Sequence, residues 1–201
     1  MPPTSPPPQL GALAARLRAL PPHCGPVRLV AVDGHAGSGK TTFAAELSRE
    51  LDGAPVVHLD DLATHDQLFD WVDRLHAEVL VPLSRGVAAR HRVYDWTARR
   101  FAGVRVVPPA PVVLVEGVGS GRRALRPHLS QLVWMDLPAA VARARGEARD
   151  GPALAEFWRG WAAAEAAHFA ADPSRRYADV LVDGADGRIR FHPDRPIPHV
   201  R

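Results

Sequence analysis

The chain has 201 residues, of which 46% are hydrophobic and 23% are charged, and its formal net charge is +3. These values are typical of one compact domain with a buried core, and they exclude a disordered or a collagen-like chain. The sequence contains no run of about 18 apolar residues, so no membrane-spanning segment is expected. The lone Cys24 cannot form an intrachain disulfide, and since no secretory signal is expected, a cytoplasmic location is predicted.

The basic residues are almost all arginine. Of the 25 basic residues, 24 are Arg and one is Lys, and acidic residues are interleaved with them along most of the chain. This distribution predicts a solvated surface rather than a concentrated stripe that binds nucleic acid. The chain contains no Asn. It therefore cannot carry an Asn-Lys-x-Asp guanine-binding motif, and a regulatory GTPase is excluded.

The elements expected from the sequence follow one another regularly. Residues 1–8 are rich in proline and are expected to be irregular. Short apolar runs predict strands over 27–32, 56–59, 111–115, 132–135 and 179–182. Apolar residues at helical spacing predict helices over 9–20, 41–51, 66–81, 138–149 and 153–171, the third of them bounded by Pro82. Residues 83–110 are basic and expected to be irregular, with short strands at 91–94 and 104–107, and the tail from His192 is expected to be extended.

This alternation of strands and helices predicts an α/β fold. A mostly parallel central sheet is expected between helices on both of its faces, which makes three layers. Ligands of such sheets bind beyond the carboxyl ends of the strands. Those ends carry acidic residues, namely Asp33, Asp60, Asp61, Glu116 and Asp136.

The only lysine lies in a glycine-rich motif between the first strand and the next helix. Residues 34–41 match the complete phosphate-loop pattern G-x-x-x-x-G-K-[ST], which predicts a P-loop NTPase fold. Backbone N–H groups of such a loop surround a phosphate chain, and the ammonium of Lys40 reaches its terminal phosphates. The residues expected to bind the nucleotide are Gly34, Ala36, Gly37, Ser38, Gly39, Lys40, Thr41 and Thr42.

Acidic residues beside this loop are expected to act on the transferred phosphate. Asp60 is expected to accept the proton of a substrate hydroxyl or to bind Mg²⁺, and Asp61 to touch metal or substrate. Either residue could instead cap a helix. Glu116 is expected to organise Mg²⁺ as a Walker B carboxylate and to contact substrate, and Thr41 is expected to place its hydroxyl on the same ion. The expected metal ligands are thus Thr41, Asp60 and Glu116.

Two groups of arginines are further candidates. Arg145 and Arg149 lie four residues apart on one helix face and are expected to act catalytically as a lid over the transferring phosphate; the alternative is a solvated helix face. Residues 90–100 mix arginines with Tyr94 and Trp96, on which a planar ring could stack, although Trp96 could equally be core. Glu165 and His168, three apart on a later helix, are assigned to packing or surface.

These residues together resemble the uridine kinase and phosphoribulokinase group of P-loop kinases. The resemblance rests on residues 34–41, 58–61, 93–96 and 113–117, on Arg145 with Arg149-Asp150, and on 177–180, in the family's order over residues 25–185. It implies ATP and Mg²⁺, and transfer of the γ-phosphate to a hydroxyl of a nucleoside or similar small molecule. It also implies that Asp60 is the base, Tyr94 a substrate contact, and Arg145 and Arg149 lid residues.

The chain departs from the family pattern at two places. Thr97, Ala98 and Arg99 stand where uridine kinases have a histidine that helps hold the nucleoside, and Gln67 stands where an acid is expected. Arg99 could instead meet a phosphate or carboxylate of the substrate. A kinase for an anionic acceptor, such as a nucleoside monophosphate or phosphosugar, is therefore the alternative, favoured by Arg90, Arg92, Arg99 and Arg100.

The expected organisation places a kinase domain over 25–185. It contains a substrate-binding insertion at 83–110 and a lid at 143–152, and it lies between a proline-rich start with a leading helix (1–24) and a tail (186–201). The expected partners are a nucleotide and a small-molecule acceptor, with neither nucleic acid nor membrane. A nucleotide-binding ATPase without such an acceptor, and a homo-oligomeric state, remain open.

Overall fold

The computed structural model describes residues 8–192. The expectations for the proline-rich start and for the tail beyond His192 fall on residues 1–7 and 193–201, outside the described residues. The strands are β1 Arg28–Asp33, β2 Val56–His58, β3 Ala89–Asp95, β4 Arg100–Val107, β5 Val112–Glu116, β6 Leu129–Asp136, β7 Val180–Asp183 and β8 Ile189–Phe191. The helices are α1 Pro8–Ala19, α2 Lys40–Glu50, α3 Val72–Leu75, α4 Val81–Ser84, α5 Ala139–Asp150 and α6 Ala155–Ala171. None of these helices is both long and apolar enough to cross a membrane.

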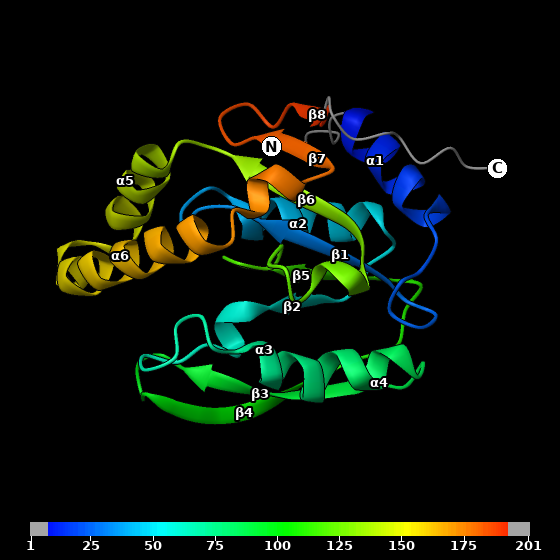
Figure 1. Cartoon of the computed structure of the whole chain (residues 1–201), viewed down its shortest axis with the longest axis horizontal. Helices are drawn as coiled ribbons and strands as arrows, with labels where there is room; N and C mark the ends of the chain where they lie inside the picture. Colours follow the sequence, from blue (N-terminus) through cyan, green and yellow to red (C-terminus); the bar gives the residue numbers. More distant parts are fainter. Residues whose placement is uncertain (1–7, 193–201) are drawn as a thin grey trace, which may run out of the picture.

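A six-stranded sheet in the order β2-β5-β1-β6-β7-β8 forms the centre of the molecule (Figure 1). Neighbouring strands from β2 to β7 are parallel, and β8 pairs antiparallel with β7. Every residue of β5, and all of β1 except Arg28, is buried. A parallel strand covered on both faces needs an almost unbroken apolar run, which is the pattern these segments show. The predicted α/β fold with a mostly parallel sheet is confirmed.

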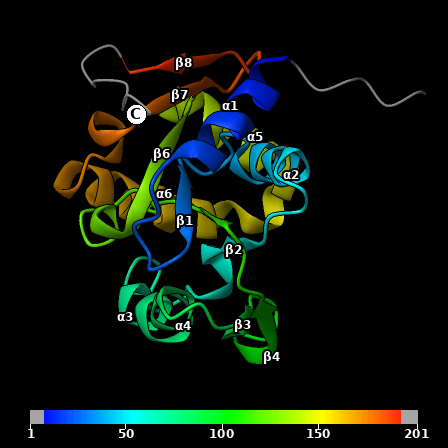
Figure 2. The same ribbon diagram turned by 90° about the vertical axis from the view of Figure 1, so that its right-hand side faces the viewer.

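Alternate residues of each strand point to opposite faces of the sheet and build two cores. On one face, Val30 packs in a cluster with Leu17 of α1 and Leu47 of α2. On the other face, Leu29 belongs to a cluster that includes Leu83 of α4. The sheet is therefore the middle of three layers, as Figures 1 and 2 show.

The helix expected over 66–81 differs from the prediction at both ends. It begins at Val72 and runs as α3, a π-helical turn over His76–Leu80, and α4, which ends at Ser84. Pro82 thus lies inside the helical segment rather than bounding it. A proline lacks the N–H and its ring clashes with the carbonyl four residues earlier. The wider π turn just before Pro82 replaces the regular hydrogen-bond ladder there.

Residues 83–110 are more regular than expected. β3 and β4 form an antiparallel hairpin that is a separate two-stranded sheet, and it lies with α3 and α4 at the end of the molecule beyond β2 (Figures 1 and 2). Burial alternates along the first four residues of β3, whereas five consecutive residues of β4, 102–106, are exposed. The apolar signal of such a hairpin is weak, so only part of each strand, 91–94 and 104–107, was predicted. β8, a three-residue edge strand, was not predicted.

Candidate functional site

The phosphate loop joins β1 to α2 at the carboxyl edge of the sheet. Gly37 has a φ angle of 84° and lies so close to α5 that a Cβ atom would be 2.1 Å from the backbone oxygen of Ala142. Only glycine tolerates this approach. Lys40 is buried, and its Nζ donates hydrogen bonds to the backbone oxygens of Gly34 at 3.0 Å and His35 at 2.9 Å. The ammonium group is therefore held against the backbone of the phosphate loop.

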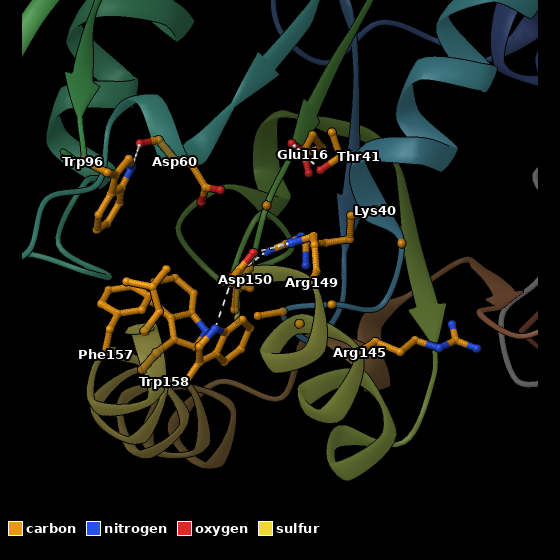
Figure 3. A pocket seen from close by; sticks show the side chains of 18 of the residues that line it. Lys40, Thr41, Asp60, Trp96, Glu116, Arg145, Arg149, Asp150, Phe157 and Trp158 are labelled. Carbon is orange, nitrogen blue, oxygen red and sulfur yellow. Dashed lines mark hydrogen bonds and ion pairs between the residues drawn. The ribbon is translucent and has the colours of Figure 1, made fainter. Parts of the chain in front are cut away.

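A cavity of about 640 Å³ opens over this loop. It extends past Asp60 to a wall of aromatic side chains, and Asp60 lies between Trp96 and Lys40 in the view of Figure 3. The predicted site residues that line it are Ala36, Gly37, Gly39, Lys40, Thr41, Thr42, Asp60, Glu116, Arg145 and Arg149. The structure thus brings together the phosphate loop, the acids that end β2 and β5, and the predicted lid.

Asp60 and Glu116 face the cavity from neighbouring strand ends. The enclosing walls and the negative charge of Glu116 raise the pKa of Asp60, and the positive charge of Lys40 counteracts them. Glu116 accepts a hydrogen bond from the Thr41 hydroxyl at 3.3 Å, and His58 Nδ1 lies 2.6 Å from Glu116 Oε1. The hydrogen bond to Glu116 raises the pKa of His58. His58 lies outside the cavity lining, and its contact with Glu116 was not predicted.

The side-chain oxygens around Glu116 could supply only some of the ligands of a magnesium ion. Within residues 8–192, no group of three or more His, Cys, Asp or Glu side chains is arranged to hold a metal. Mg²⁺ in phosphate-transfer sites is commonly held by one or two carboxylates together with phosphate oxygens and waters. Thr41, Asp60 and Glu116 supply a hydroxyl and two carboxylates, and the charge of Glu116 raises the pKa of Asp60. The donor set therefore suits a nucleotide-bound Mg²⁺.

Two of the remaining acids at the strand ends, Asp33 and Asp136, are structural. Asp33 is fully buried and accepts hydrogen bonds from the backbone N–H groups of Gly34, Gly119 and Gly121 at 2.7–2.9 Å. Burial raises the pKa of Asp33, and these hydrogen bonds counteract the rise. Asp136 pairs with the Arg175 guanidinium at 2.9 and 3.1 Å, which lowers its pKa. Neither carboxylate lines the cavity.

Several predicted contacts lie outside the cavity lining. Asp61 is buried against the β3–β4 hairpin, where its Oδ2 lies 3.0 Å from Arg105 Nη1. Tyr94 is buried, and its hydroxyl lies 3.0 Å from His65 Nδ1. Arg99 is exposed at the turn of the hairpin, with a φ angle of 52°. Gly34 and Ser38 belong to the phosphate loop, but they too lie outside the lining.

The two predicted lid arginines have different partners. Arg149 forms a bidentate pair with Asp150 at 2.6 and 2.9 Å, and Asp150 also accepts a hydrogen bond from Trp158 Nε1 at 3.2 Å. That pair raises the pKa of Arg149 and lowers the pKa of Asp150. Arg145 extends away from Asp60 and donates to the backbone oxygen of Gly184 at 2.7 Å (Figure 3). Both guanidinium groups are therefore held by protein oxygens.

An aromatic wall closes the cavity opposite the loop. Its side chains come from the loop after β2, the hairpin turn and α6, and they are His65, Trp96, Phe157, Trp158 and Trp161. Trp96 Nε1 donates to the backbone oxygen of Asp60 at 3.0 Å, so the wall is tied to the acidic residue that it faces. None of the α6 rings was predicted as a site residue, and neither was His65. Helical spacing marks such rings as buried but does not show that one side of the cluster is hollow.

The fold and the cavity define the class of the protein, a P-loop kinase-like domain. A family model described as an AAA domain matches residues 29–158. The chain belongs to this AAA domain family, and the resemblance to P-loop kinases of the uridine kinase type is confirmed. No curated protein matches the chain in sequence.

Solved structures share the fold. A possible uridine kinase from Bacillus stearothermophilus superposes with a TM-score of 0.63 at 22% identity, and the match covers 87% of this chain and 97% of that one. A "putative fructose transport system kinase" from Silicibacter sp. TM1040 superposes with a TM-score of 0.52 at 24% identity, covering 70% of this chain and 80% of that one. At these identities the likeness shows the common architecture.

Proposed function

We propose that the protein is an ATP-dependent kinase that transfers the γ-phosphate to a hydroxyl group of a small molecule, with a nucleoside as the first expected acceptor. One observation carries the proposal: Lys40 of the phosphate loop, Asp60 and the aromatic wall all face one cavity. A phosphate donor at the loop and an acceptor at the wall would meet beside a carboxylate. An ATPase without an acceptor would have no need of that second half of the cavity.

In this proposal Asp60 is the base. It takes the proton of the acceptor hydroxyl while the hydroxyl oxygen bonds to the γ-phosphorus and the bond to the ADP oxygen breaks. Because its pKa is raised, the carboxylate of Asp60 is a stronger proton acceptor than an ordinary aspartate. Lys40 and the loop N–H groups neutralise the phosphates. Thr41, Asp60 and Glu116 would hold Mg²⁺, which adds to that neutralisation when bound.

The lid proposal concerns residues 143–152. Arg149 would exchange its carboxylate partner Asp150 for a phosphate oxygen, and Arg145 would exchange the Gly184 carbonyl in the same way. Both belong to α5, which contacts the phosphate loop at Gly37. We also propose the division into a kinase domain over 25–185 and an acceptor-binding insertion over 83–110, which contributes Trp96 and Thr97 to the cavity.

The character of the wall favours a neutral acceptor with a flat ring. Trp96 and Phe157 offer ring surfaces to the cavity, and planar heterocycles stack on such surfaces. The arginines that would favour an anionic acceptor do not line it: Arg92 pairs with Glu78 at 3.1 Å, and Arg90, Arg99 and Arg100 are exposed on the hairpin. Tyr94 would act on the acceptor through His65 rather than by direct contact.

The test is an acceptor panel. Purified protein with MgATP is incubated with nucleosides, nucleoside monophosphates, sugars and phosphosugars, and ADP formation and the phosphorylated product are measured. We expect a nucleoside to stimulate ADP release and to gain one phosphate. Stimulation only by phosphorylated acceptors would favour the anionic alternative. ADP release that no acceptor changes would contradict the kinase proposal.

A further inference from the structure

Glu165 of α6 reaches the phosphate loop from a distant part of the chain. Its Oε1 accepts a hydrogen bond from the backbone N–H of Ala36 at 2.7 Å, and its Oε2 lies 3.0 Å from His35 Nδ1. A carboxylate can only accept, so His35 Nδ1 carries the proton of this contact. Burial raises the pKa of Glu165, but the hydrogen bonds from His35 and Ala36 outweigh it and the pKa is lowered. The carboxylate is therefore charged where it meets the loop.

The contact lies outside the space that a phosphate chain would occupy. Ala36 and Lys40 line the cavity, whereas Glu165 and His35 do not. Glu165 is also buried, with an exposed fraction of 9%. It therefore supports the loop from behind and does not compete with phosphate for the cavity.

A second contact from α6 fixes the same part of the loop. The His35 ring packs edge-on against Phe169 and Trp134, with ring centroids 5.0 and 5.5 Å away. Phe169 lies one helical turn after Glu165, so both side chains leave the same face of α6. His35 is thus held by its ring and by its Nδ1 at once.

The supported segment is the one on which Lys40 rests. The ammonium of Lys40 donates to the backbone oxygens of Gly34 and His35. A backbone that moves at His35 and Ala36 moves these two carbonyl groups and the loop N–H groups that follow. The position of α6 therefore affects the position of the Lys40 ammonium through a short series of direct contacts.

We propose that Glu165 is a positioning residue for phosphate binding, which holds the His35–Ala36 segment so that Lys40 and the loop N–H groups fit a triphosphate. The inference rests on the proposed function and adds a residue to it. Two hydrogen bonds to one charged carboxylate order the loop before the nucleotide arrives, and loss of that order weakens binding. The sequence gives no sign of this role, because the partners are about 130 positions apart.

The test separates the length of the side chain at position 165 from its charge. Glu165→Asp keeps the charge but withdraws the carboxylate by one methylene, whereas Glu165→Gln keeps the reach. The Gln amide accepts from Ala36 and donates to His35, since a neutral imidazole can change tautomer. We expect E165D to raise the Kd for MgATP by about tenfold or more, and E165Q to stay within about threefold of the unsubstituted protein. Kd is measured by calorimetry well below the melting temperature of each variant.

Two further measurements separate positioning from stability. Glu156 lies exposed in the first turn of the same helix, and E156D and E156Q serve as matched controls with unchanged Kd. A residue that only stabilises the fold would lower the melting temperature and leave the Kd of the folded protein unchanged. The melting temperature of each variant is therefore measured without nucleotide.

The outcomes are distinct. Weak binding by E165D with recovery in E165Q supports the proposal. Unchanged binding by E165D, equal weakening in both variants, or tighter binding would overturn it, the last because Glu165 would then be blocking the loop. If the unsubstituted protein fails to bind MgATP, the proposed function fails and this inference fails with it.

Discussion

Asp60 and Asp61 are adjacent in the chain but have different surroundings. Both lie in the 3₁₀ turn Leu59–Asp61, in which successive side chains leave the axis about 120° apart. Asp60 consequently faces the cavity, while Asp61 is buried beside Arg105 of the hairpin. The turn assigns the proposed chemistry to one acid and an ion pair to the other.

Substitution of the proposed base should separate binding from transfer. We expect Asp60→Asn to lower kcat for phosphate transfer by about 10²- to 10⁴-fold, the usual contribution of a general base. The Kd for MgATP should change far less than kcat, because Lys40 and the loop N–H groups are untouched and Thr41 and Glu116 remain to hold Mg²⁺. Asp61→Asn is the matched comparison, and it should lower the melting temperature rather than kcat. A normal transfer rate in D60N would show that another group takes the proton.

The Asp136 pair predicts a dependence of stability on pH. The hydrogen bonds from Arg175 lower the pKa of Asp136, so its stabilisation is complete above the ordinary aspartate pKa of about 3.9 and is lost as pH falls through the lowered value. At pH 7 we expect Asp136→Asn to cost about 0.5–1 kcal/mol, as for a favourable partly exposed pair. Urea unfolding at pH 7, 5 and 3 should give equal differences at the first two and a smaller one at pH 3. A difference already lost at pH 5 would contradict this cause.

Sequence position located the acids at the strand ends but did not fix their directions. Asp33, Asp60, Glu116 and Asp136 all follow parallel strands, and all lie at the expected edge of the sheet. Only Asp60 and Glu116 line the cavity. The direction of each side chain depends on N–H groups and guanidinium groups from distant segments, which a single strand cannot indicate.

At the scale of elements, α5 and α6 pack together where Gly146 of α5 lies against the ring of Trp158, which belongs to the cavity wall. A Cβ atom on Gly146 would lie 2.3 Å from the ring of Trp158. We expect Gly146→Ala to displace this ring and to destabilise the fold by about 1–3 kcal/mol, as overpacking does. Gly160→Ala is the control in α6, where nothing lies within 4 Å, and it should stabilise by about 0.5–1 kcal/mol through helix propensity.

Denaturant unfolding of the two variants checks this prediction. Tryptophan fluorescence should also change in G146A, since Trp158 belongs to the displaced wall. Equal stability changes in both glycine variants would indicate that the two helices separate freely at this point.

The central strands were predictable because each is buried on both faces and is therefore an almost continuous apolar run. The hairpin was less predictable, since most of β4 is exposed and Arg90 and Arg92 interrupt the apolar pattern of β3. β8 has three residues at the edge of the sheet, and the partners that stabilise it, β7 and the Gln9 side chain of α1, lie elsewhere in the chain. The prediction that the helix ends before Pro82 was wrong because the π turn that precedes this proline lets the helical segment continue through it.

At the scale of the whole molecule, ligand binding should raise stability. A ligand that binds only the folded chain adds about 2.7 kcal/mol at one hundred times its Kd. For a chain of this size that corresponds to a rise in melting temperature of about 5–10 °C. We expect this shift with a non-hydrolysable ATP analogue and Mg²⁺, measured by differential scanning fluorimetry. Lys40→Ala should abolish most of it, and an equal shift in K40A would contradict the phosphate-loop assignment.

The arrangement of α6 constrains attempts to redesign the proposed kinase for other acceptors. One end of this helix supplies Phe157, Trp158 and Trp161 to the wall, and about two turns later the same rod supports the phosphate loop through Glu165. A substitution in the wall that introduces a larger or smaller ring and tilts α6 would therefore change the affinity for the nucleotide as well. Phe157 is half-buried and, of the three wall rings of α6, lies nearest the start of the helix and farthest from Glu165. It is therefore the position at which the acceptor range of the proposed kinase can be altered with the least effect on the donor.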